Sequence, residues 1–232
     1  MSKKALPYFF IFLGLAVAGF FVSTALVKAK KFDRIVRVKG LAEREVPANL
    51  AIWPMEISLA GNNLAELESL IDKQKKTVSD FFHNFGFGPE EFKVGITNIR
   101  DNKTEFYGGA PAEFRYIAKT EITLRTDKIE LLLTAQSASN ELLRQGVVLN
   151  SKNSWRPVEY SFTGLNEIKP EMIAEATKNA RKAAEQFKAD SDAQLGDIYK
   201  ADQGLFSISD RDMNTPEIKT IRVVSTIEFY LN

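Results

Sequence analysis

The first candidates for acid–base chemistry are one histidine and three close pairs of glutamates. They are His83, Glu43 with Glu45, Glu66 with Glu68, and Glu90 with Glu91. A general acid–base pair needs two carboxyl groups in one cleft with separated pKa values, and closeness in sequence does not supply this. The histidine lies on a predicted helix among phenylalanines, with no second histidine to share a metal ion. We therefore predict no catalytic residue among these groups.

Motifs for nucleophiles, metals and nucleotides are also missing from the sequence. The chain has no cysteine, which excludes a thiol nucleophile, a disulfide and a Cys-ligated metal centre. Asp190, Asp192 and Asp197 lack the spacing and terminal glutamate of a calcium loop. Ser207 and Ser209 lie outside any G-x-S-x-G turn, and no phosphate-binding glycine motif occurs. The sequence predicts a protein that is not an enzyme and has no cofactor or metal site.

Two aromatic residues, Phe106 and Tyr107, lie in a polar, glycine-rich loop expected over residues 101–112. Core burial is not the automatic explanation for aromatic side chains in such a loop. Exposed aromatic residues are typical of surfaces that dock a partner, a second subunit or a membrane. Local packing over the neighbouring sheet is the alternative. We take Phe106 and Tyr107 as the candidate partner-binding loop.

An uncharged, apolar segment over residues 5–27 precedes the elements that would position these groups. A helix of this length spans about 34 Å, enough for a hydrocarbon core of about 30 Å. It predicts a transmembrane signal-anchor, with residues 1–4 as a cytoplasmic tip and 28–34 as a juxtamembrane linker. A cleaved signal peptide is the alternative, because Ser23, Thr24 and Ala25 offer a small-residue cleavage site.

The basic residues around this segment leave its orientation in conflict. Five of them lie on its C-terminal side and two on its N-terminal side: Lys28, Lys30, Lys31, Arg34 and Arg37 against Lys3 and Lys4. The positive-inside rule alone would place the body in the cytoplasm, but the rule weakens for long translocated domains. A signal-like start favours export. We expect a single-pass protein of the inner (cytoplasmic) membrane with its body in the periplasm or another extracytoplasmic space.

The charge of the body argues against nucleic acid as a partner. Of the 31 basic residues, five lie within residues 1–31, which contain no acid. The remaining chain carries 26 basic and 30 acidic residues, a net charge of −4. A mildly acidic body has no general field that attracts a polyanion.

Strands and helices alternate along the body. Period-two or apolar runs predict strands over residues 35–42, 50–59, 92–99, 114–125, 147–149, 158–162, 198–201, 205–209 and 218–231. Helical periodicity predicts helices over 64–85, 129–145 and 170–191. Asn63 with Glu66 forms a capping-box spacing, Gly146 is placed after the second helix, and Pro170 opens the third. Residues 43–49 read as a turn.

The order of these elements indicates the fold class. Pairs of strands separated by helices predict an α+β fold of repeated βαβ-like units, with three helices on one face of mostly antiparallel sheet. The inner stripe of the third helix is expected to be rich in alanine, which lets a helix lie close to a sheet. It is expected to consist of Ile173, Ala176, Ala180, Ala183, Ala184 and Phe187. One continuous sheet and two subdomains both fit this pattern.

With the elements placed, the body resembles the SIMPL-domain (DUF541) family of bacterial exported proteins over about residues 35–231. The resemblance is carried by Gly40 and Val46-Pro47 near the start, by the run from Ala174 to Glu185, by Leu195-Gly196-Asp197-Ile198, and by the closing strand over residues 221–231. The acidic residue usual after that proline is replaced by Ala48-Asn49. The resemblance implies an extracytoplasmic protein, some relatives being associated with stress tolerance, and it implies no catalytic residue.

Three functions remain open at this point. The first is a non-enzymatic, membrane-anchored protein of the cell envelope that self-assembles or binds envelope partners, with a role in stress protection implied by the resemblance. The second is a binding module for a small ligand or a polypeptide, with residues 101–112 as a lid beside an apolar pocket. The third is a cofactor-free hydrolase, which would need two of the carboxylates to converge.

Overall fold

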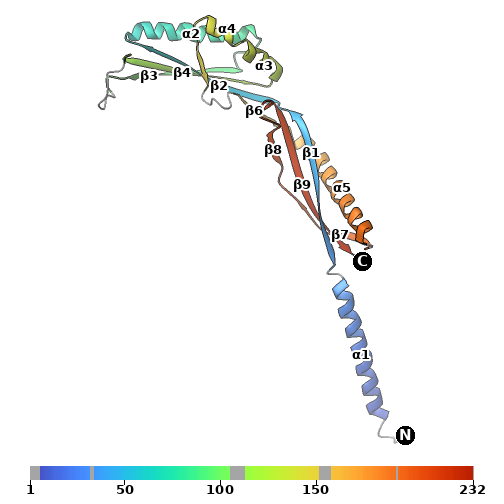
Figure 1. The fold of residues 1–232 in the computed structure, drawn as a ribbon. Coiled ribbons are helices and arrows are strands. Elements are labelled where there is room, and N and C mark those ends of the chain that lie inside the picture. The colour runs from blue at the N-terminus through green and yellow to red at the C-terminus, as the bar shows by residue number, and fades with distance from the viewer. Residues whose placement is uncertain (1–5, 32–33, 105–112, 152–157, 192, 232) are drawn as a thin grey trace. The chain divides into compact units, whose positions relative to one another are not determined.

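A computed structural model describes residues 6–31, 34–104, 113–151, 158–191 and 193–231 (Figure 1). The helices are α1 (Leu6–Lys31), α2 (Leu64–Asn84), α3 (Ile129–Ala138), α4 (Asn140–Arg144) and α5 (Leu165–Ser191). The strands are β1 (Ile35–Pro47), β2 (Leu50–Gly61), β3 (Phe92–Asp101), β4 (Tyr116–Thr126), β5 (Leu149–Ser151), β6 (Glu159–Ser161), β7 (Leu195–Gln203), β8 (Ser207–Asp210) and β9 (Ile218–Leu231). The fold is α+β with antiparallel sheets.

The chain forms two compact units, each with a sheet of its own. Unit 1 comprises Met1–Arg44, Asn166–Ile208 and Ile221–Asn232. Unit 2 comprises Glu45–Leu165 and Ser209–Thr220. The sheets have the strand orders β1-β9-β7, with β8 also paired to β9, and β3-β4-β2-β5, with β6 also paired to β2. This settles the question that the sequence left open between one continuous sheet and two.

Unit 2 places α2, α3 and α4 on one face of its sheet (Figure 1). Alternate residues of β2, among them Trp53 and Met55, are buried on the helix side, as the period-two pattern predicts. They pack with Phe82 and Phe87, which are fully buried. Asn63 caps α2 through its side-chain oxygen, which accepts from the backbone N–H groups of residues 65 and 66. The predicted cap is confirmed.

A proline in the middle of the unit 2 sheet has a structural explanation. Central strands seldom contain proline because it donates no ladder hydrogen bond. Pro54 lies on β2 between two short partner segments, because β6 pairs with residues 50–52 and β5 with residues 55–57. The missing N–H therefore falls where that side of β2 has no strand partner, and the pairing with β4 continues past it.

Unit 1 packs α5 against its sheet through small residues. Met172, Ala176, Ala180 and Ala184 are fully buried and follow a strict four-residue spacing along α5. Gly40 of β1 lies so close to this row that a Cβ there would stand 1.9 Å from the backbone oxygen of Ala176. The predicted alanine-rich stripe is confirmed, but Ala183 and Phe187, which we expected on it, are exposed.

Several predicted boundaries are wrong. The turn expected over residues 43–49 is largely strand, because β1 continues to Pro47. The single helix expected over residues 129–145 is two helices, α3 and α4. They are separated at Ser139, where the backbone hydrogen bonds join residues three apart, as in a 3₁₀ turn. The described part of the body therefore has four helices instead of three. The third predicted helix starts five residues early, so Pro170 lies inside α5 and not in its first turn.

The transmembrane assignment of residues 5–27 is not confirmed and remains a prediction. Over the residues that the structure describes, no helix is both long and apolar enough to cross a membrane.

Candidate functional site

The helix-free face of the unit 2 sheet carries an open hollow of about 520 Å³. Its lining comes from the three long strands β2, β3 and β4: Glu56, Gly95, Ile96, Thr97, Asn98, Ile99, Lys119 and Glu121. Since α2, α3 and α4 cover the opposite face, this side of the sheet has no helix of the unit over it (Figure 1).

A β-bulge in β3 shapes this hollow. The register between β3 and β4 shifts between Val94 and Thr97, so Gly95 and Ile96 together oppose Glu121. At the bulge a Cβ on Gly95 would come within 3.0 Å of the backbone oxygen of Glu121, which explains the glycine. Ile96 is left 94% exposed, an unusual position for a large apolar side chain on a strand.

Two of the charged groups that line the hollow are paired with one another. Lys119 Nζ donates to Glu56 Oε1 at 2.9 Å. A charge pair beside an exposed isoleucine is suited to contact with another polypeptide. Because Lys119 and Glu56 are paired, neither is free to act as a base or an acid.

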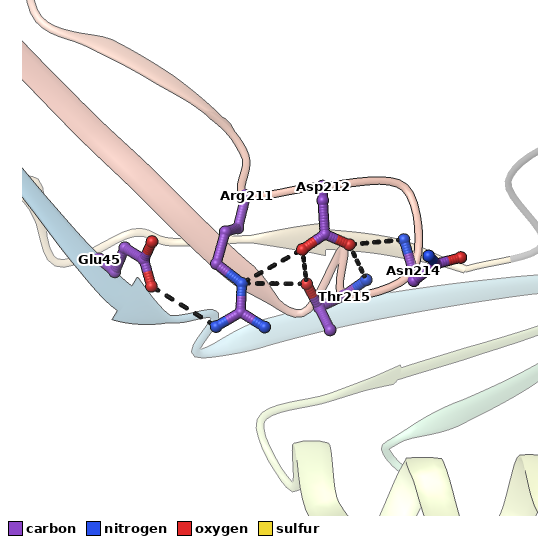
Figure 2. A network of polar contacts seen from close by, with 5 residues as sticks. All are labelled: Glu45, Arg211, Asp212, Asn214 and Thr215. Atoms are coloured by element: carbon purple, nitrogen blue, oxygen red, sulfur yellow. Dashed lines mark hydrogen bonds and ion pairs between the residues drawn. The ribbon is translucent and has the colours of Figure 1, made fainter.

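A network of polar contacts lies in the connection between β8 and β9 (Figure 2). Asp212 accepts from the Thr215 hydroxyl at 2.5 Å, from the backbone N–H of Asn214 at 2.8 Å and from that of Thr215 at 2.9 Å. Arg211 Nε donates to Asp212 at 3.3 Å, and the Arg211 guanidinium lies 3.5 Å from Glu45.

These contacts explain the acidity of Asp212 and define its role. The Thr215 hydroxyl, followed by the backbone N–H of Asn214, lowers the pKa of Asp212 to about 2. A carboxylate held ionised near neutral pH cannot donate a proton. The network therefore fixes the β8–β9 connection, as an Asx turn does. Beside it, Lys219 is buried and pairs with Asp210.

The predicted acid–base candidates do not converge. Glu91 accepts from the backbone N–H of Gly88 at 2.8 Å, from Thr126 at 2.5 Å and from Lys128 Nζ at 2.6 Å. Burial acts to raise the pKa of Glu91, but these hydrogen bonds, that from Lys128 foremost, outweigh it and lower the pKa. Glu91 thereby ties the start of β3 to the end of β4, and its two oxygens are occupied by these donors.

Three further candidates have local partners. His83 is exposed, with Nδ1 3.3 Å from the Ser79 backbone oxygen and its ring edge-on to Phe92. Glu66 accepts from the Asn63 side chain as part of the helix cap. Asp190 accepts from Gln186 on the same helix. Among the described residues, no three acidic or histidine side chains gather into a metal site.

The aromatic loop chosen from the sequence cannot be placed. Phe106 and Tyr107 lie outside the described residues, and so does Asp192. The hollow and its exposed Ile96 were not predicted. One signal could have found them, because an isolated glycine within a strand pattern, here Gly95, indicates a bulge.

Comparison with known families gives one match. A family model described as "SIMPL: Protein of unknown function (DUF541)" matches residues 36–226, most of both units. No curated protein matches the chain significantly.

Proposed function

The chain belongs to the SIMPL family, and from that premise we propose that it is a non-enzymatic, membrane-tethered protein of the cell envelope. In this proposal residues 5–27 hold it in the cytoplasmic membrane, its body lies outside the cytoplasm, and the body self-assembles or binds envelope partners. The open hollow around Ile96 is the observation that carries the binding role.

The tether is supported by the exposure of apolar side chains on α1. Every side chain described from residue 11 to residue 23 is exposed, including Phe12, Phe20 and Phe21. Such a row of large apolar groups is costly in water and favourable in lipid. The lysines at positions 28, 30 and 31 would then meet anionic lipid headgroups.

The binding role is supported by the form of the helix-free face. A wide, shallow hollow with an apolar side chain at its rim and paired charges in its lining fits a protein surface better than a small ligand, which prefers an enclosed pocket. The absence of a converging acid–base set among the described residues favours binding over catalysis.

The proposal is tested on the full chain expressed in bacterial cells. Membrane fractionation followed by protease treatment of spheroplasts should find the chain in the membrane and its body digested from outside. Native mass spectrometry of the detergent-solubilised chain should then show a discrete oligomer or a bound partner. A chain released from membranes by salt alone, or a body protected from protease, would contradict the tether or its orientation.

The binding face is tested by replacing Ile96 with Asp. Because this side chain is almost fully exposed, the variant should fold normally but lose the mass of a bound partner. Leu64→Asp provides the control, since Leu64 is an exposed leucine at the start of α2, which covers the opposite face of the same sheet. Equal loss in both variants, or in neither, would contradict a role for the hollow.

A further inference from the structure

Among the strands that the structure describes, β1 lies at an open edge of the unit 1 sheet. It is the outermost strand of the order β1-β9-β7 and is 13 residues long. The Leu231 N–H donates to Arg34 O at 2.8 Å, and the Ala48 N–H donates to Glu217 O at 2.7 Å. Even-numbered residues of β1 therefore bond to β9, and the N–H and C=O groups of the odd-numbered residues point to the open edge.

The side chains of these odd-numbered residues form a symmetrical pattern. All are exposed, whereas Val36, Gly40 and Ala42 are buried on the α5 side. In chain order the exposed residues are Ile35, Arg37, Lys39, Leu41, Glu43, Glu45 and Pro47. Two bases precede Leu41 and two acids follow it at equal distances, and Leu41 is the midpoint of β1.

We propose that β1 pairs edge to edge with β1 of a second copy of this chain, antiparallel, around a two-fold axis at Leu41. In this register Lys39 lies opposite Glu43 of the partner subunit, and Arg37 lies opposite Glu45 of the partner subunit. Each pair occurs twice because the interface is isologous. Odd-numbered residues of one copy lie opposite odd-numbered residues of the other. The N–H and C=O groups at the two open edges therefore face one another and can form a new ladder of hydrogen bonds.

The two inner charged residues of this pattern, Lys39 and Glu43, take no part in polar contacts within the described chain. Neither Lys39 nor Glu43 makes a hydrogen bond or ion pair with any part of the chain that the structure describes. Arg37 and Glu45 already contact Glu228 and Arg211, so the inner pairs contribute most of the selectivity. Charges opposite one another on neighbouring strands stabilise the pairing when their signs differ and oppose it when they match.

The backbone at the centre and at the ends of β1 fits the same register. Asn179 donates to Leu41 O at 2.8 Å, and a carbonyl oxygen has a second lone pair for the Leu41 N–H of the partner subunit. Pro47, which has no N–H, stands at the last position of the ladder, opposite Ile35 of the partner subunit. A proline at that point costs no interior hydrogen bond.

This inference rests on the self-assembly in the proposed function and names the surface that performs it. A two-fold axis perpendicular to the sheet keeps both copies of Ile35 at the same height along that axis. Two membrane anchors can therefore enter one membrane whose plane is perpendicular to the axis.

Single-cysteine cross-linking of the full chain in native membranes tests the register, because the natural chain has no cysteine. At the axis, Leu41→Cys places two Cα atoms about 5.5 Å apart, within the range of about 4.4–6.8 Å that a disulfide accepts. Ile35→Cys is the matched control: both side chains are 40% exposed on the same face of β1. The two copies of residue 35 would lie about 40 Å apart, at about 3.4 Å per residue.

The expected result is a disulfide-linked dimer for Leu41→Cys and none for Ile35→Cys under mild oxidation. Equal cross-linking of both, or of neither, overturns the inference. The native mass of the unmodified chain shows whether a negative result contradicts the β1 register alone or self-assembly as a whole. A discrete oligomer without the Leu41→Cys dimer refutes only the β1 register, whereas a monomer refutes self-assembly itself.

Charge reversal in the Leu41→Cys chain provides a second, independent test. Lys39→Glu alone and Glu43→Lys alone each place like charges opposite one another twice. Each should raise the concentration needed for half-maximal dimer at least about tenfold. A mixture of the two variants restores both attractive pairs, so the hetero-dimer should return to the original yield. Restoration also shows that both variants fold, and its failure overturns the inference.

Discussion

In unit 2, α2 meets its sheet through large side chains, whereas in unit 1 α5 meets its sheet through alanines and a glycine. Phe82 of α2 contacts Trp53 edge-on at a centroid distance of 5.9 Å and lies among Phe81, Phe87 and Phe92. Ala176 and Ala180 of α5 lie against the backbone of Gly40. In unit 2, large aromatic side chains fill the space between helix and sheet. In unit 1, small residues allow the backbones of helix and strand to lie close together.

The two units should therefore be sensitive to opposite kinds of substitution. A core filled by aromatic rings loses stability when a ring is removed, because a cavity remains. A close backbone approach loses stability when a methyl group is added, because two backbones have to move apart. Hydrogen exchange measured peptide by peptide in the full chain can follow each unit separately.

The largest effect is expected from Phe82→Ala in unit 2. Removing this fully buried ring should lower the free energy of unfolding by about 3–5 kcal/mol. Amide protection should fall in α2, β2 and β4 while α5 keeps its protection. Phe114→Ala is the control, since Phe114 is a partly exposed phenylalanine of the same unit. Equal loss of protection in α5 would mean that the units do not respond independently.

The next effect is expected from Gly40→Ala in unit 1. The added Cβ would clash with the backbone of Ala176 and Ala180, so unit 1 should lose stability at the upper end of about 1–3 kcal/mol. Protection should fall in α5 and β1. Gly61→Ala is the matched control, because a Cβ there meets only a leucine side chain at 3.7 Å. A neutral Gly40→Ala would refute the close approach of α5.

A smaller effect is expected from Asn63→Ala, which removes the cap of α2 but no core contact. Two backbone N–H groups lose their acceptor, so unit 2 should lose about 1 kcal/mol. The loss should appear in the denaturant midpoint of unit 2, and Asn63→Asp, which keeps an acceptor oxygen, should restore most of the stability. No recovery with Asp would mean that the side chain does not act as a cap.

The smallest effect is a pH dependence carried by Asp212 in unit 2. Its folded pKa of about 2 lies below its ordinary value near 3.8, so its ionised form stabilises the folded state. That stabilisation is present above about pH 4 and is lost as the pH falls through about 2. Between these values, Asp212→Asn should show a shallower fall in stability than the natural chain in acid unfolding curves. Parallel curves would refute the role of Asp212.

Much of the local structure could be predicted because its causes are local. The limits of β9, the alternation along β4 from Ala118 to Leu124, the Asn63 cap and the αL position of Gly146 all follow from side-chain period or backbone preference. The continuation of β1 through Glu43 and Glu45 was not predicted, because a run of charged residues before a proline is typical of a turn. They belong to a strand because β1 is paired with β9, with hydrogen bonds to β9 or its neighbouring residues at both ends of β1.

The features of the candidate sites can also be divided into those visible in the sequence and those that depend on the folded chain. The sequence alone shows that a cysteine nucleophile and a pair of histidines are missing, since folding cannot supply an absent residue. It could not find the hollow around Ile96, which needs the bulge opposite Glu121. It also could not show that Asp212 has a lowered pKa, because the donors at Asn214 and Thr215 act only in the folded turn.

The family, the α+β class, the order of strands and helices and the apolar segment over residues 5–27 can all be read from the amino-acid sequence. These properties depend on composition, period and local backbone preference. The division into two sheets, the strands at the sheet edges and the sheet face without a helix become known only from the folded chain. Strand pairing joins residues far apart in the chain, as at Arg34 and Leu231, and nothing in the neighbourhood of either residue specifies the other.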